Sequence, residues 1–141
     1  MGQTTSIDPV TLNLWYPIVA IGDAKPGIVG ATRLLEQAIS FALDSAGKAA
    51  AWKSRPELRV GDTVDVAAVA DPLPVIMAYG YLWTSLGSPA ADIFPIPQYA
   101  EPDRRNIAAA SIGVNVSAPR AIENFLDMGH FPYVHLSLIH I

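Results

Sequence analysis

Residues 74–87 read "PVIMAYGYLWTSLG", and this stretch has the strongest β-strand pattern in the chain. Most of it consists of β-branched, aromatic and other apolar residues, which favour strands. Tyr79, Tyr81 and Trp83 stand at alternate positions, and alternate residues of a strand point to the same face of a sheet. The stretch therefore predicts strand structure with three aromatic side chains on one face.

Shorter strand signals precede this stretch. Residues 12–21, "LNLWYPIVAI", are rich in β-formers and are followed by the turn sequence "GDAKPG". Residues 28–43 predict two short strands that meet around 34–37, and "AAAW" at 49–52 predicts another. Several short strands separated by Gly and Pro turns are typical of a β-sandwich or a small barrel. The chain is therefore predicted to be mainly β.

A proline-rich segment, "SPAADIFPIPQYAEPDRRN" at 88–106, follows the strands and holds four of the twelve prolines. Proline cannot donate a hydrogen bond to a sheet, so this segment predicts an extended connection and a domain boundary. We place the first domain at 1–103 and the start of a second at 104. Beyond it, "IAAASIGVNV" at 107–116 predicts a strand, and Pro119 suits the first turn of a helix.

The composition excludes several classes of function. The net charge is −4 and the nine Lys and Arg residues are scattered, which argues against a nucleic-acid partner. Cysteine is absent, which excludes disulfides, thiolate zinc sites, a cysteine nucleophile and an iron–sulfur cluster held by this chain. No stretch approaches the roughly 20 apolar residues of a membrane helix, and "MGQTTSIDP" lacks the features of a signal peptide. A cytoplasmic protein is predicted.

The stretch "ENFLDMGHFPYVH" at 123–135 gathers two of the three histidines together with two carboxylates. On a helix over 119–130, Glu123, Asp127 and His130 fall at i, i+4 and i+7, along one stripe. Phe125 and Leu126 then lie on the adjoining apolar flank, where we expect them to be buried. The helix is predicted to bury one flank and to present two carboxylates and an imidazole beside it.

His135 would point away from His130 on a regular helix, so convergence requires a break, which Gly129 or Pro132 would provide. Two imidazoles and a carboxylate form the facial site that binds Fe(II) and leaves positions open for dioxygen. On spacing alone, a solvated carboxylate stripe and a histidine favoured by the C-terminal helix dipole explain the same residues. The spacing therefore leaves both interpretations open.

The full pattern Glu123-x3-Asp127-x2-His130-x4-His135 resembles the mononuclear iron motif of Rieske-type non-haem iron oxygenases. It looks especially like the aromatic ring-hydroxylating and the O- or N-demethylating alpha subunits. The resemblance implies that His130 and His135 bind mononuclear Fe(II), and that the third ligand, a carboxylate, lies beyond this chain. It further implies that Asp127 is the bridge for electrons that arrive from a neighbouring subunit, with Glu123 in a supporting role.

The resemblance extends upstream to "LWYPIVAI", "TRLLEQAISF" and "YGYLWTSLGSPA". These segments look like the opening strands and the closing hairpin of the family's N-terminal Rieske domain. The fold implied is a Rieske-like β-sandwich over 1–103. It is followed over 104–135 by the first strand and helix of a truncated α+β catalytic domain of the helix-grip type.

One departure concerns the Rieske cluster. The family's Cys-x-His and Cys-x-x-His ligand pairs are absent, and the interval 53–78, where their loops should stand, contains neither residue type. The first domain is therefore expected to hold no [2Fe–2S] cluster and to lack the cluster loops. Electrons would then come from another polypeptide, a reductase or a separate Rieske protein.

A second departure is the ending "LSLIHI" at 136–141. These residues match the translation of a common transposon-based sequencing adaptor. We expect them to be non-native, so His140 is not expected to be a ligand.

The functional prediction is a fragment of an oxygenase alpha subunit that activates dioxygen to hydroxylate or demethylate an aromatic or heterocyclic substrate. The parent is expected to be an oligomeric mono- or dioxygenase, and the fragment alone to be inactive. Two alternatives stay open. One is a non-catalytic β-domain that keeps the motif for packing, and the other is a zinc hydrolase that uses His130, His135 and a carboxylate.

Overall fold

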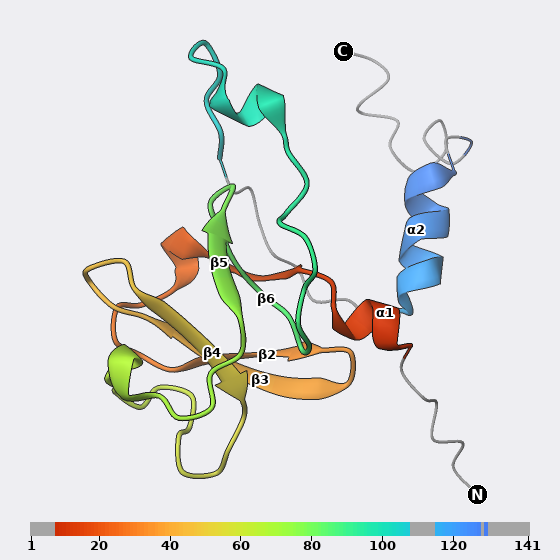
Figure 1. Ribbon diagram of the computed structural model, residues 1–141. Coiled ribbons are helices and arrows are strands. Elements are labelled where there is room, and N and C mark those ends of the chain that lie inside the picture. Colours follow the sequence, from red (N-terminus) through yellow and green to blue (C-terminus); the bar gives the residue numbers. More distant parts are fainter. Residues whose placement is uncertain (1–7, 108–114, 128, 130–141) are drawn as a thin grey trace, which may run out of the picture. The chain divides into compact units, whose positions relative to one another are not determined.

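A computed structural model describes residues 8–107, 115–127 and 129 (Figure 1). These residues divide into two compact units, one up to residue 107 and one from 115 to 129. The first unit contains the short helix α1 (Pro9–Leu12) and all six strands, and the second contains helix α2 (Ala118–Leu126). The prediction of a mainly β chain is confirmed. No helix in these described ranges is long and apolar enough to cross a membrane.

The six strands form two antiparallel three-stranded sheets. The first sheet has the order β1 (Tyr16–Ala20), β6 (Tyr81–Thr84), β5 (Val75–Ala78), and its register shifts between Pro17 and Val19.

The second sheet has the order β2 (Gly30–Leu34), β3 (Gln37–Leu43), β4 (Ala49–Lys53). The strands predicted around 34–37 and at 49–52 are therefore confirmed.

Two-residue turns join β2 to β3 and β5 to β6. Both central residues of each turn have positive φ, at Leu35 and Glu36 in one and at Tyr79 and Gly80 in the other. Such turns match the right-handed twist of the paired strands. The stretch 74–87 is thus a hairpin, and the prediction that Tyr79 belongs to a strand is wrong, because Tyr79 occupies the turn.

The main apolar core joins the two sheets. Leu82 of the first sheet packs there with five buried residues of the second, namely Leu34, Ile39, Phe41, Leu43 and Ala51.

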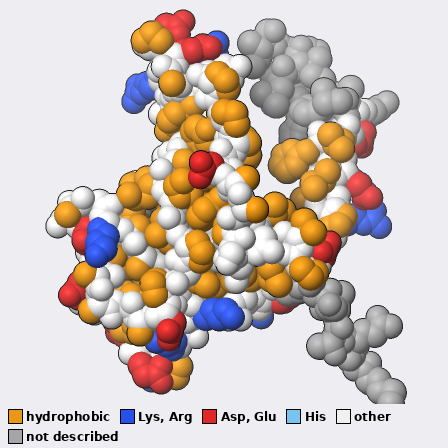
Figure 2. Space-filling model, viewed as in Figure 1, with side chains coloured by type: hydrophobic (Ala, Val, Ile, Leu, Met, Phe, Trp, Pro, Cys, Tyr) orange, Lys and Arg blue, Asp and Glu red, His pale blue; other side chains and the backbone are white. Residues whose placement is uncertain are grey.

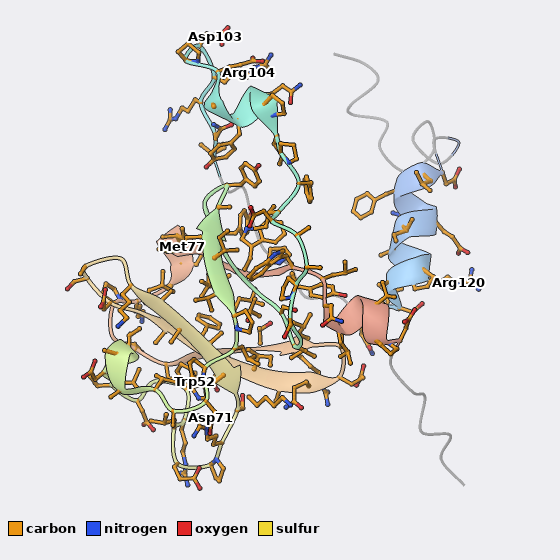
Figure 3. The ribbon with its side chains drawn as sticks, viewed as in Figure 1. Trp52, Asp71, Met77, Asp103, Arg104 and Arg120 are labelled. Carbon is orange, nitrogen blue, oxygen red and sulfur yellow. The ribbon has the colours of Figure 1, made fainter. Side chains whose placement is uncertain are left out.

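A second, smaller core lies on the other side of the second sheet and is centred on Trp52 (Figure 3). Trp52 is fully buried there among Val29, Ala42, Ala50 and Val66. Its indole N–H has no hydrogen-bond partner among the described residues. The interval 53–78, where cluster loops were expected, therefore begins at the end of β4, and the Trp52 side chain of that strand fills an apolar core.

The proline-rich segment 88–106 forms no strand, and it has one 3-10 turn, Pro97–Ala100. It is tied to the β5–β6 hairpin through Tyr79, whose hydroxyl donates to the Phe94 carbonyl at 2.9 Å and accepts from the Ile96 N–H at 2.9 Å. The rings of Tyr79 and Tyr99 also meet edge to face, with centroids 5.0 Å apart. The segment therefore packs on the first unit, and the domain boundary predicted within it stays a prediction.

Other predictions fall on undescribed residues. The strand expected over 107–116 lies largely outside the described residues, and the ending 136–141 lies wholly outside them. The Rieske-like and helix-grip assignments, the domain limits at 103 and 135, and the cytoplasmic location stay predictions.

Candidate functional site

Helix α2 carries the described part of the predicted iron motif. Ser117 is its N-cap residue, and Pro119 stands in the first turn, where a fixed φ and a missing N–H do no harm. The helix ends at Leu126, and the next residue, Asp127, has the non-helical angles φ −77° and ψ 89°. The predicted helix over 119–130 is therefore too long at its C-terminal end.

The side chain of Asp127 explains this early end. Its Oδ1 accepts a hydrogen bond from the N–H of Gly129 at 2.9 Å, while its own N–H still donates to the carbonyl of Glu123 at 2.9 Å. Aspartate side chains bond to backbone N–H groups two residues ahead and so compete with the helix. The helix breaks at Asp127, before the residues Gly129 and Pro132 at which the break was predicted.

Because α2 ends at Leu126, the predicted stripe of ligands along one helix face does not hold. The alignment of Glu123, Asp127 and His130 at i, i+4 and i+7 assumed one continuous helix, and that assumption is wrong. His130 and His135 lie outside the described residues, as does His140. The roles of His130 and His135 as iron ligands, and of Asp127 as an electron bridge, remain predictions.

Glu123 lies on the exposed part of α2 and has a local partner. Its Oε2 lies 3.1 Å from the Nη1 of Arg120, one helical turn earlier, and both side chains are mostly exposed (Figure 3). Such surface pairs contribute little to stability, about 0.5 kcal/mol or less. The supporting role predicted for Glu123 stays a prediction.

The apolar flank of α2 is exposed. The solvent-exposed fractions are 57% for Ile122, 79% for Phe125 and 75% for Leu126. The prediction that Phe125 and Leu126 are buried is therefore wrong for this chain. The physical reason is that the described part of the second unit offers no surface to cover them.

Within 8–107, 115–127 and 129, no three His, Cys, Asp or Glu side chains gather closely enough to hold a metal ion. All three histidines fall outside these ranges, so the predicted iron site itself lies outside the described residues.

The first unit has an aromatic cleft that the sequence indicated only in part. Tyr79, Tyr81 and Trp83 line it from the β5–β6 hairpin, and Tyr99 and Arg105 come from the segment that follows. Hydrophobic side chains gather along the projection that this hairpin and segment form (Figure 2). The alternation of three aromatic residues was the visible signal, whereas nothing in the sequence placed Tyr99 or Arg105 beside them.

Comparison with known proteins gives one informative relative. No protein-family model matches the sequence. The chain is 36% identical, over 125 residues, to a Pseudomonas sp. (strain TJI-51) protein named probable methylxanthine N7-demethylase NdmC. The match covers 89% of this chain and 39% of that protein, so the chain spans about two fifths of the relative's length. The chain is thus partly homologous to a protein that is named as a demethylase.

Proposed function

We propose that this chain is part of an oxygenase alpha subunit of the Rieske-type non-haem iron class, which removes an N-methyl group from a planar heterocycle. The relative supports this proposal because its name describes N-demethylation of methylxanthines, which are planar heterocycles. The similarity extends over 125 residues, so it cannot rest on the thirteen-residue motif alone. The motif resemblance and the relative support the same chemistry.

The donor set of the motif suits Fe(II). Two neutral imidazoles, from His130 and His135, are the ligand type that iron accepts together with one carboxylate. Bound there, Fe(II) would supply the activation of dioxygen. In the described neighbourhood, the Asp127 carboxylate holds the turn to Gly129 that leads directly to His130. The role of this chain's residues is then to present two imidazoles immediately after a helix end.

The chain does not suit a [2Fe–2S] cluster. Such clusters need cysteine thiolates, and the sequence has no cysteine. The apolar core around Trp52 occupies the interior next to the segment in which cluster loops would stand. Electrons for the proposed reaction would therefore come from another polypeptide.

The proposed reaction balances with dioxygen and an external reductant. One oxygen atom enters the N-methyl group to give N-hydroxymethyl, and the other leaves as water after uptake of two electrons and two protons. The N–CH2OH product then loses formaldehyde, and the nitrogen keeps a hydrogen. A ring-hydroxylating reaction would consume dioxygen and release no formaldehyde, so the two predicted chemistries can be told apart.

Metal analysis tests the proposal against its alternatives. We expect the chain, continued to the stop codon of its gene, to bind one Fe(II) per subunit under anaerobic conditions. His130→Ala should abolish stoichiometric iron, whereas the control Glu57→Ala, which removes an exposed carboxylate of the first unit outside the motif, should leave it unchanged. Preference for zinc over iron would favour the hydrolase, and no metal at all would favour the non-catalytic β-domain.

A further inference from the structure

The aromatic cleft of the first unit has the size and the lining of a ligand site. Its volume is about 630 Å³, which lies within the usual range of roughly 300–1,000 Å³ for small-molecule sites. Tyr79, Tyr81, Trp83 and Tyr99 provide its walls, and the described lining includes Arg105 but no Asp or Glu. Aromatic walls with a few polar groups are the usual composition of sites that bind small molecules.

Internal contacts hold the walls in place. Tyr79 lies in the β5–β6 turn at φ 54°, a conformation that side-chain-bearing residues rarely adopt. Its hydroxyl is fixed by bonds to the backbone of Phe94 and Ile96, and its ring contacts the Tyr99 ring. The Asn106 side chain donates to the Tyr99 carbonyl at 2.7 Å, which closes the segment on itself. The cleft is therefore formed before any ligand arrives.

The cleft presents several hydrogen-bond donors to a ligand. Among the described residues, no hydrogen bond or ion pair engages the Arg105 guanidinium or the hydroxyls of Tyr81 and Tyr99. The neighbouring Arg104 differs, because it pairs with Glu101 and lies at the tip of the segment (Figure 3). The described part of the cleft thus offers flat apolar walls, hydrogen-bond donors and one cation, Arg105, that no described residue pairs.

We propose that this cleft binds a planar aromatic ring that carries a carboxylate. The ring would lie against the tyrosine and tryptophan side chains, and ring pairs of this kind are favourable beyond the area they bury. The carboxylate would accept two parallel hydrogen bonds from Arg105, whose planar guanidinium matches it. The site belongs to the first unit, and its existence does not depend on the proposed oxygenase activity.

The test is a titration of the 141-residue chain with four probes: 2-naphthoate, the neutral 2-naphthamide, benzoate and the saturated cyclohexanecarboxylate. The readout is the NMR shift of the Trp83 indole N–H, with the buried Trp52 indole as an internal reference that should not move. We expect saturable binding of 2-naphthoate, weaker binding of benzoate, and binding of 2-naphthamide that is about tenfold weaker than that of 2-naphthoate. Cyclohexanecarboxylate should bind least.

Two arginine variants test whether the carboxylate of 2-naphthoate binds Arg105. Arg105→Gln should weaken 2-naphthoate binding about tenfold without changing the affinity for 2-naphthamide, whereas Arg104→Gln should change neither. Unchanged Trp52 shifts in both variants show that the fold is intact. The proposal is overturned if 2-naphthoate gives no saturable Trp83 shift, if both variants weaken binding equally, or if the saturated acid binds as well as the aromatic one.

Discussion

The turn that follows α2 allows the two roles considered for Asp127 to be separated by substitution. In the structure, the Asp127 carboxylate accepts the Gly129 N–H at 2.9 Å and ends the helix at Leu126. Asn at position 127 keeps an oxygen at the same place and removes the charge, whereas Ala removes both. Asp127→Asn should therefore preserve the helix end, and Asp127→Ala should allow the helix to continue toward residue 129.

The magnitude follows from the single hydrogen bond. Because this region is exposed, we take the lower part of the usual net range for one hydrogen bond, about 0.5–1 kcal/mol. That corresponds to about a 2- to 5-fold lower population of the turn in the Ala variant. Backbone Cα chemical shifts of residues 126–129 measure this population directly. Glu123→Gln, which changes a carboxylate inside α2 and leaves the Asp127–Gly129 bond in place, is the matched control.

The same pair of variants bears on the proposed chemistry. In the chain continued to its stop codon, Asp127→Asn should keep iron and lose turnover, because the charge required of an electron bridge is gone. Asp127→Ala should lose iron affinity as well, since the turn before His130 is weakened. Equal Cα shifts in the Asn and Ala variants would refute the argument for the turn.

Three further changes test the fold around the sites. Gly30→Ala should destabilise the first unit by about 1–3 kcal/mol in urea unfolding, because the new Cβ would clash with the Phe41 ring, whereas Gly22→Ala, which meets nothing within 4 Å, should be neutral. Trp52→Ala should cost about 3–5 kcal/mol. Trp52→Phe should cost clearly less, because Phe still fills much of the core and the indole N–H that it removes has no partner among the described residues. Glu123→Gln should change thermal stability by less than about 0.5 kcal/mol, and a larger loss would show that its surface ion pair is more than local.

Most strands of the first unit could be predicted from the sequence, because short local patterns of residues specify them. Alternating apolar residues and short turns predicted the strands at β1, β2, β3 and β4. The β5–β6 hairpin was harder, because the alternation of Tyr79, Tyr81 and Trp83 runs through the turn. Gly80 was the available signal, since a two-residue turn of this type favours glycine.

For helix α2, the sequence predicted that a helix forms and where it begins, but not where it ends. Pro119 marked the first turn correctly, whereas the C-terminal end was set by a side-chain bond from Asp127 to Gly129. An Asp two residues before a Gly is a recognisable turn signal. The same carboxylate also fits a stripe of metal ligands, so the sequence alone does not distinguish the two roles.

The aromatic cleft needed information that no local pattern contains. Tyr99 and Arg105 reach the hairpin because the hydroxyl of Tyr79 holds the backbone at Phe94 and Ile96. Contacts of this kind depend on how a loop without regular structure folds back. Proline composition predicted that the loop is extended, and it could not predict where the loop packs.

Product analysis tests whether the proposed non-haem iron oxygenase removes an N-methyl group. The chain continued to its stop codon, loaded with Fe(II), would be supplied with a reductase, dioxygen and an N7-methylated xanthine. We expect one formaldehyde to be released for each dioxygen consumed, with no product when His130 is replaced by Ala, and no turnover by the 141-residue chain. Iron-loaded protein that consumes no dioxygen with this substrate, or formaldehyde release that persists in the His130→Ala variant, would contradict it.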